Sequence, residues 1–146
     1  METSEIAGLM DQSPDAVIFA DTEGVIRYWN AAAERVFGFA AEAAIGQNLD
    51  LVVPEQFREP HWTGFDRALG DGDTKYRGQS LPTRSLRADG STFYVELSFG
   101  IVKDEAGAVT GAIACARDIT ARFESDRDMR RRLRELEAQV KASEAP

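Results

Sequence analysis

Histidine and cysteine are almost absent from this sequence, since each occurs once, as His61 and Cys115. A single cysteine has no partner for an internal disulfide, and such usage is typical of proteins in a reducing compartment. A single histidine excludes a metal site built from several imidazoles. No nucleophile, base and orienting residue form a recognisable set in the sequence, and we therefore expect no enzyme activity.

Long apolar stretches and an excess of basic residues are also missing. No apolar run approaches the roughly 20 residues that cross a bilayer, and the acidic N-terminus lacks the regions of a secretory signal. We therefore expect a cytoplasmic protein that does not bind membranes. The net charge is −8, and residues 1–60 hold 11 acidic against 3 basic side chains. Because an acidic surface repels phosphate backbones, nucleic acid is not an expected partner.

The residues that are present suffice for one domain, because 146 residues with 43% apolar and 29% charged side chains can bury a core. Turn residues and β-rich or helical runs predict strands over 16–20 and 25–29, helices over 31–37, 40–45 and 54–69, and strands over 76–86, 93–99 and 109–116. The order β-β-α-α-α-β-β-β predicts an α+β fold. Its core would be a five-stranded antiparallel sheet with helices on one face.

The ends of the predicted helices carry typical signals. Asn30 is a good N-cap for the first helix, and Gly38 ends it. In the segment that begins near Pro54, Pro60 suits the first turn of a helix better than the helix interior. We therefore expect the main part of that helix to begin at Glu59 or Pro60.

Both ends of the chain are expected to be helical. Apolar residues at helical spacing before residue 12 predict a short amphipathic helix. Near the C-terminus, apolar residues are spaced by four, three and four positions, as in a coiled coil: Met129, Leu133, Leu136 and Val140. Two heptads are marginal alone, so we expect this helix to pair in a homodimer or with a neighbouring domain. The chain would then divide into a helical cap (1–12), a central domain (13–120) and a coiled-coil helix (121–146).

Several local patterns between residues 12 and 122 resemble the PAS family of sensory domains. The patterns are Asp15-Ala16-Val17-Ile18-Phe19-Ala20-Asp21 with Gly24, Trp29-Asn30-Ala31-Ala32-Ala33-Glu34, Phe37-Gly38-Phe39, Ile45-Gly46, Arg87-Ala88-Asp89-Gly90-Ser91 and Arg117-Asp118-Ile119-Thr120. The resemblance implies the PAS fold. It leaves the ligand open, because PAS domains bind haem, flavin, small acids or nothing.

A more local pattern is similar to the haem PAS domain of FixL-type oxygen sensors. The two segments can be laid together without a gap from Pro54 to Gly90, and the matching residues are Pro54-Glu55, Arg58, His61 and Arg67. This resemblance implies that His61 is the proximal ligand of the iron of haem b. It also implies that Arg67 contacts a haem propionate.

Helical spacing around His61 agrees with that implication. The imidazole would emerge from an apolar face directed at the sheet, which also carries Gly64, Phe65, Ala68 and Leu69. The absence of a side chain at Gly64 would let a flat macrocycle approach, and the guanidinium of Arg67 can pair with a carboxylate. Trp62 lies about 100° around the helix from His61 and is expected to be a packing or lid residue. The alternative is that His61 is an ordinary surface or interface residue.

The opposite wall of the site is expected on the strands. The resemblance aligns Tyr76, Leu97 and Phe99 with apolar residues on the distal side of the haem, although the same alternation fits any core-facing strand. Leu81 stands where FixL-type domains have the arginine that hydrogen-bonds oxygen, and leucine has no donor. An apolar distal wall would favour NO or CO over O2, a sixth protein ligand, or a redox role.

These inferences predict a haem-based sensor of a diatomic gas (O2, NO or CO) or of redox state, which signals through its C-terminal helix. Asp118 and Thr120 lie at the junction with that helix and are expected to cap it. The output is expected in an unidentified partner or domain. Two alternatives remain, a cofactor-free PAS module for dimerisation or protein interaction and a PAS sensor of a small organic ligand. Cys115 is expected to be a small buried residue, since the reactive-cysteine motif of flavin photosensors is missing.

Overall fold

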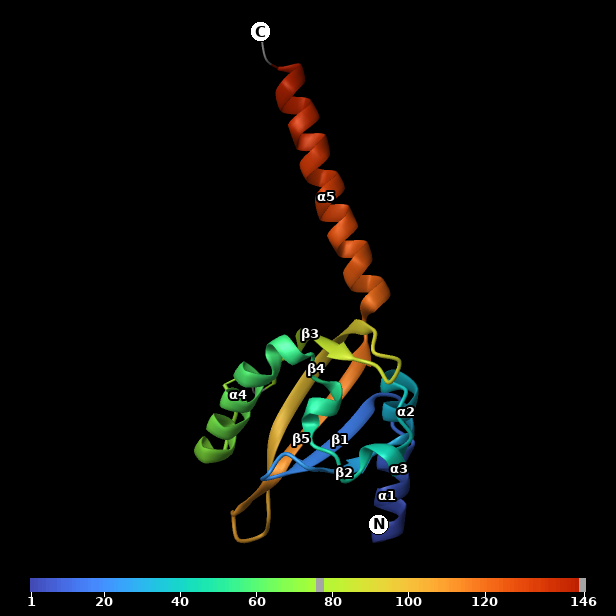
Figure 1. Cartoon of the computed structure of the whole chain (residues 1–146), viewed down its shortest axis with the longest axis vertical. Coiled ribbons are helices and arrows are strands. Elements are labelled where there is room, and N and C mark those ends of the chain that lie inside the picture. Colours follow the sequence, from blue (N-terminus) through green and yellow to red (C-terminus); the bar gives the residue numbers. More distant parts are fainter. Residues whose placement is uncertain (76–77, 145–146) are drawn as a thin grey trace.

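An antiparallel sheet forms the centre of the structure, a computed structural model that describes residues 1–75 and 78–144 (Figure 1). Within those residues the sheet has five strands in the order β2-β1-β5-β4-β3, so β1 and β5 lie side by side. The bounds are α1 (Thr3–Asp11), β1 (Ala16–Asp21), β2 (Ile26–Trp29), α2 (Ala31–Phe37), α3 (Ala41–Ala44), the 3-10 helices η1 (Leu49–Val52) and η2 (Glu55–Phe57), α4 (Arg58–Asp71), β3 (Leu81–Leu86), β4 (Thr92–Lys103), β5 (Val109–Asp118) and α5 (Thr120–Ser143). The predicted α+β architecture is confirmed.

The helix-covered face of the sheet carries the hydrophobic core. Three aromatic rings lie at its centre: Phe37 of α2 packs 5.4 Å from Trp29 and 5.6 Å from Phe93 between ring centroids. Alternation along the strands directs every second residue to this face. The other buried members of the cluster are Ala16, Ile18, Ile26, Ala33, Ala44, Val95 and Ala116. The core therefore lies between helices α2 and α3 and strands β2, β1, β5 and β4.

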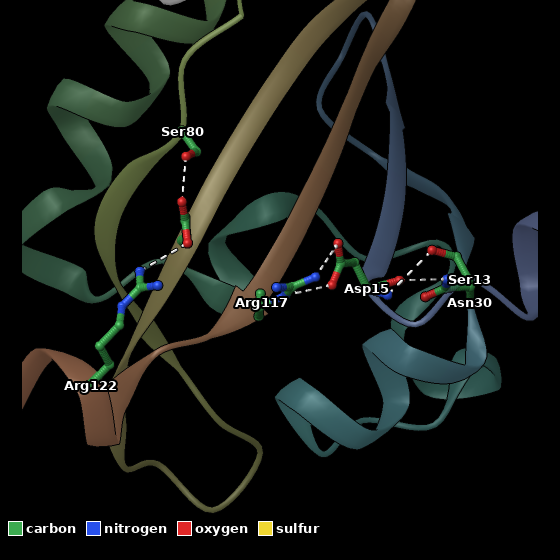
Figure 2. A network of polar contacts seen from close by, with 7 residues as sticks. Ser13, Asp15, Asn30, Ser80, Arg117 and Arg122 are labelled. Carbon is green, nitrogen blue, oxygen red and sulfur yellow. Dashed lines mark hydrogen bonds and ion pairs between the residues drawn. The ribbon is translucent and has the colours of Figure 1, made fainter.

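Asn30 is a buried polar residue that joins α1, β1 and α2. Its side-chain oxygen accepts two hydrogen bonds and its nitrogen donates two, to backbone groups of Met10, Asp15, Val17 and Ala33. The predicted N-cap of α2 is thus confirmed, and Gly38, with φ +83°, ends the helix as expected. Figure 2 shows Asn30 beside Asp15, whose carboxylate pairs with Arg117 of β5 at 2.9 Å. These bonds fix the start of β1 against the last strand.

Strand β5 is longer than predicted and leads directly into α5, which is held at its first turn by β4. The N–H of Ile119 donates to the carbonyl of Tyr94 at 2.9 Å, and the ring of Phe123 stacks on that of Tyr94 at 3.9 Å. The Asp118 carboxylate accepts from the N–H of Thr120 at 2.9 Å, which satisfies a free donor of the helix as expected. The hydroxyl of Thr120 does not cap the helix, because it bonds the backbone of Tyr94.

Further element boundaries differ from those predicted; β4, for example, ends at Lys103 and not at residue 99. The third strand was expected to begin at Tyr76, which lies outside the described residues, but β3 begins at Leu81. Gly78 takes a φ of +73°, which interrupts an extended chain. The main helix begins at Arg58 and places Pro60 in its first turn, where the helix needs no N–H. The residues before it form the separate 3-10 helix η2.

The predicted terminal helices are present as α1 and α5, and Figure 1 shows them at opposite ends of the molecule. Both carry exposed apolar side chains, among them Ile6 and Leu9 on α1. The division of the chain at residues 12 and 120 stays a prediction. In the part of the chain that the structure describes, no helix has the length and apolar character needed to span a membrane.

Candidate ligand site on helix α4

Trp62 fastens α4 to the rest of the domain. Its indole nitrogen donates to the carboxylate of Asp50 in η1 at 2.8 Å. The ring also lies against Gly24 in the turn between β1 and β2, where an added Cβ would be 2.3 Å from two ring carbons. Gly24 has a φ of +79°, so both its conformation and its contact with the ring require glycine. Trp62 is therefore a packing residue, as its position on the helix predicted.

Arg58 holds the beginning of α4 in the same way. Its Nε donates to the carbonyl of Val53 at 3.1 Å, and a terminal nitrogen donates to the carbonyl of Asp50 at 3.4 Å. The guanidinium is also 3.9 Å from the Asp50 carboxylate. This arginine of the FixL-like pattern thus supports the helix that carries His61.

His61 lies beside two aromatic rings, those of Trp62 and Phe65, on the less exposed side of α4. The imidazole is edge-on to Trp62 at 4.9 Å and nearly parallel to Phe65 at 6.1 Å between centroids. The residue is half-buried, and its Nδ1 is buried with no hydrogen-bond partner among the described residues. Burial lowers the pKa of His61 below 6.5, and the negative charge of Asp50 opposes this only in part. At neutral pH the ring is therefore largely uncharged, and a neutral imidazole can act as a metal ligand.

The other predicted residues of α4 differ in exposure. Phe65 and Leu69 are half-buried and Ala68 is buried, so they share the inner side of the helix with His61. Gly64 is exposed at the edge of this face, and a methyl group there would meet no protein atom within 4 Å. Arg67 is exposed to solvent. It makes no ion pair within the described part of the chain.

On the sheet, three predicted residues lie on the helix-covered face. Leu97 packs against the core cluster, and Phe99 follows it on the same face of β4. Leu81 of β3 is directly opposite Leu97 in the β3–β4 pairing, and all three are half-buried. The fourth, Tyr76, lies outside the described residues. Arg84 follows Leu81, the position that lacks a hydrogen-bond donor, by three residues on β3. Its side chain therefore lies on the outer face of the sheet, where it donates to the Tyr94 hydroxyl at 2.8 Å.

A row of alanines on β5 is a feature of the site that the sequence argument missed. Ala112, Ala114 and Ala116 alternate along the strand and pair with Ile101, Phe99 and Leu97 of β4. Strand β5 therefore presents only methyl groups to the helical side, between Ile18 of β1 and larger side chains on β4, and the residues at 112 and 114 are half-buried. The alternation of alanines before Arg117 was the sequence signal that could have indicated this row. Such a low, apolar surface suits a flat ligand.

The remaining candidates do not form a second site. Cys115 is half-buried, not buried as predicted, because alternation with the alanines places it on the outer face of the sheet. Burial and the nearby Asp15 raise its pKa, which makes the thiol less reactive. Among the residues that the structure describes, no three His, Cys, Asp or Glu side chains are grouped to hold a metal ion. A metal at His61 would need ligands that it brings itself.

A helical layer on one face of an antiparallel sheet, and a helix that continues from its last strand, are features of small α+β sensor domains. The chain belongs to the PAS fold family, which matches residues 10–124. It is 30% identical to the sensor protein FixL of Bradyrhizobium diazoefficiens over 137 residues, which cover 94% of this chain and 26% of that protein.

Two further comparisons describe the range of similar proteins. The oxygen sensor protein DosP of Escherichia coli is 24% identical over 109 residues, which cover 75% of this chain and 13% of DosP. The chain spans about a quarter or less of the length of the curated relatives it matches. A solved RNA-binding Light-Oxygen-Voltage receptor is similar with a TM-score of 0.70 and 25% identity, covering 97% of this chain and 40% of that one.

Proposed function

We propose that this PAS domain binds haem b through His61 and senses a diatomic gas or the redox state of the iron. The observation that carries the proposal is the half-buried, largely uncharged imidazole on the inner side of α4, whose Nδ1 has no partner among the described residues. Haem brings its own ring nitrogens, so it fits a site with one protein ligand. The match of Pro54, Arg58, His61 and Arg67 to the FixL pattern supports the same assignment.

Each residue of the site would have its own task. His61 would bind the iron, and Arg67, which has no ion pair in the described chain, would pair with a propionate. The side chains of Phe65, Leu97 and Phe99 would exclude water from the bound gas. Bound haem would supply an iron whose open position accepts O2, NO or CO. The space beside Gly64 and the alanine row of β5 would admit the flat ring.

Leu81 offers no hydrogen-bond donor to a bound gas, and this affects which gas the site would bind stably. A bound O2 molecule carries partial negative charge and is stabilised by a hydrogen-bond donor, whereas CO and NO depend less on one. Leu81 offers only methyl groups beside Leu97. We therefore infer a short-lived oxygen complex and a preference for NO, CO or a redox signal.

The output would pass through α5, because its first turn is held by β4, the strand that also carries Leu97 and Phe99. A change in the packing of that strand would alter the pose of the helix. We propose a homodimer and a downstream partner or domain whose identity is open.

The direct test is the absorption spectrum of the purified chain after addition of haemin. We expect a shifted Soret band for the wild type and for Thr63→Ala, a matched control on the exposed side of α4. His61→Ala should change or lose the band, and added imidazole should restore it. An unchanged spectrum in His61→Ala, or no shift in the wild type, would refute haem ligation by His61.

A second candidate function is a cofactor-free PAS module for dimerisation or protein interaction, which the exposed apolar side chains of α5 favour. A small organic ligand on the alanine row would be the third candidate. If haemin gives no Soret shift, thermal denaturation of the chain with and without flavin or small acids separates the second candidate from the third. Only a domain that binds one of these ligands should gain stability from it.

A further inference from the structure

Charged side chains of alternating sign form a row on the outer side of the sheet. In order they are Asp15 before β1, Arg117 of β5, Glu96 of β4 and Arg122 of α5. Two nitrogens of Arg117 donate to the Asp15 carboxylate, at 2.9 and 3.4 Å, and Arg122 donates to Glu96 at 3.0 Å. Figure 2 shows both pairs. The row therefore contains one ion pair at each end.

The two middle members of the row, Arg117 and Glu96, belong to different pairs although they stand directly opposite each other in the β4–β5 pairing. Cβ atoms at opposite positions are about 4.5–5.5 Å apart, well within the reach of an arginine side chain. Bonds from Ser80 and Arg122 lower the pKa of Glu96, and the charge of Arg117 adds to this effect. Arg117 thus has two carboxylates within its reach and is bonded to Asp15.

Glu96 helps to attach α5 to the sheet. Its carboxylate accepts from Arg122 in the first turn of that helix, beside the stacked rings of Phe123 and Tyr94. Its other oxygen accepts from the Ser80 hydroxyl at 2.5 Å. A second guanidinium at this carboxylate would repel Arg122 and share the negative charge that holds it. The attachment of α5 therefore depends on where the guanidinium of Arg117 lies.

The position of Asp15 depends in turn on helix α1. The side-chain nitrogen of Asn30 donates to the carbonyl of Met10 in α1 at 3.0 Å and to the carbonyl of Asp15 at 3.1 Å. All residues of α1 except Gly8 and Met10 are exposed. Since one amide group holds both carbonyls, a displacement of α1 acts on Asp15.

We propose that Arg117 is a switch residue between Asp15 and Glu96, through which the position of α1 controls how firmly α5 is attached to the sheet. In the arrangement described, Asp15 holds Arg117 and leaves Glu96 to Arg122. When α1 withdraws Asp15, Arg117 turns to Glu96 and weakens the bond to Arg122. Coupling between distant sites needs an element with two discrete arrangements, and a cation between two carboxylates is such an element.

This route is separate from the candidate ligand site. His61 and the alanine row lie on the helix-covered face of the sheet, whereas the row of charges lies on the outer face. Helix α5 would therefore receive two inputs, one from each face. The inference rests on the proposed function only in taking α5 as the output. It needs no haem, so a haemin titration without a Soret shift leaves it standing.

Amide hydrogen exchange at Phe123, measured by NMR on the chain without haem, reports the attachment of α5. The N–H of Phe123 is bonded to the carbonyl of Ile119 at 2.8 Å and exchanges when the first turn opens. We expect Asp15→Asn to raise this exchange rate about two- to threefold, the range for one exposed ion pair. The bond from Asn30 goes to the backbone of residue 15 and remains. Glu105→Gln, which removes an exposed charge in the β4–β5 turn, should leave the rate unchanged.

Arg117→Met separates the switch from a merely structural role. If the pair with Asp15 only stabilised the fold, losing Arg117 would raise the exchange rate at Phe123 as much as losing Asp15. The switch predicts a rate no higher than that of the wild type, because the competitor for Glu96 is gone. Asp15→Asn combined with Arg117→Met should likewise exchange at the wild-type rate. A double variant as fast as Asp15→Asn alone, or equal rates in Asp15→Asn and Glu105→Gln, would refute the switch.

Gly8→Pro tests α1 as the input. Proline at this position breaks the helix, because it lacks the N–H and collides with the preceding turn. We expect faster exchange at Phe123 in the chain that keeps Arg117 and no change in the Arg117→Met chain. An unchanged rate in the first chain would overturn the role of α1. Equal acceleration in both chains would overturn transmission through Arg117.

Discussion

Gly24→Ala should loosen α4 although residue 24 lies outside that helix. A methyl group at this position would be 2.3 Å from two carbons of the Trp62 ring, so the ring must move. That movement breaks the 2.8 Å hydrogen bond from Trp62 to Asp50. It also removes one of the rings beside His61, which is 4.9 Å away between centroids.

The magnitude has three parts. Alanine at a φ of +79° costs about 1 kcal/mol in any setting. Loss of the indole hydrogen bond adds about 1 kcal/mol, and displaced ring contacts add a similar amount. Gly107→Ala is the matched control, because Gly107 has a φ of +85° with nothing within 4 Å of the added methyl. We expect about 2–3 kcal/mol of destabilisation for Gly24→Ala against about 1 kcal/mol for Gly107→Ala.

Urea denaturation measures that difference in the free energy of unfolding, and NMR locates it. The chain has one histidine, so its imidazole signal is unambiguous. In Gly24→Ala the signal should shift and the pKa of His61 should rise toward 6.5, since burial, the main cause of its lowered value, is reduced. Equal destabilisation of the two variants, or an unchanged His61 signal in Gly24→Ala, would contradict the packing role of Trp62.

Three further predictions concern the output junction and the sheet. Burial raises the pKa of Asp118, but bonds from Thr120 and Arg87 outweigh it and hold the pKa below 3.8. The carboxylate thus stabilises the fold above pH 3.8, and this stabilisation is lost as the pH falls through its lower folded-state pKa. Asp118→Asn should therefore lower the free energy of unfolding by about 1 kcal/mol at pH 7 and leave it unchanged in strong acid, as measured by urea denaturation. Ala114→Phe should fill the low surface on β5 and weaken haemin binding at least about tenfold in a spectral titration with the chain still folded; unchanged affinity would place the ligand elsewhere. Leu81→Arg should lengthen the life of the ferrous oxygen complex, which we expect to oxidise rapidly in the wild type, in stopped-flow absorption; identical oxidation rates would show that residue 81 does not face the gas.

Local signals made most of the fold predictable. Asn30 and Gly38 mark the ends of α2 because capping and positive φ depend on a few neighbouring residues. The hairpin of β1 and β2 and the order of the elements follow from turn residues and alternation in the same way. The start of β3 was not predictable, because Gly78 interrupts a run whose composition still favours a strand.

The site depended on contacts that local patterns do not contain. Gly24 is explained by its turn alone, so nothing in the sequence indicated that Trp62 would pack on it. The alanine row on β5 carries little hydrophobic signal, although it determines how much room the sheet leaves. The haem assignment of His61 came from a family pattern, and the structure adds its burial, ring neighbours and lowered pKa.

The length of α5 has a mechanical consequence. Its 24 residues make a rod about 36 Å long that is anchored at one end. If the rod pivots at Thr120 by about 5°, its far end is displaced by about 3 Å, more than half the rise of one helical turn. The side chains at the sheet need to move by only a fraction of that distance. In the proposed signalling role α5 would work as a lever, because a small adjustment inside the domain would become a displacement large enough for a neighbouring protein to detect.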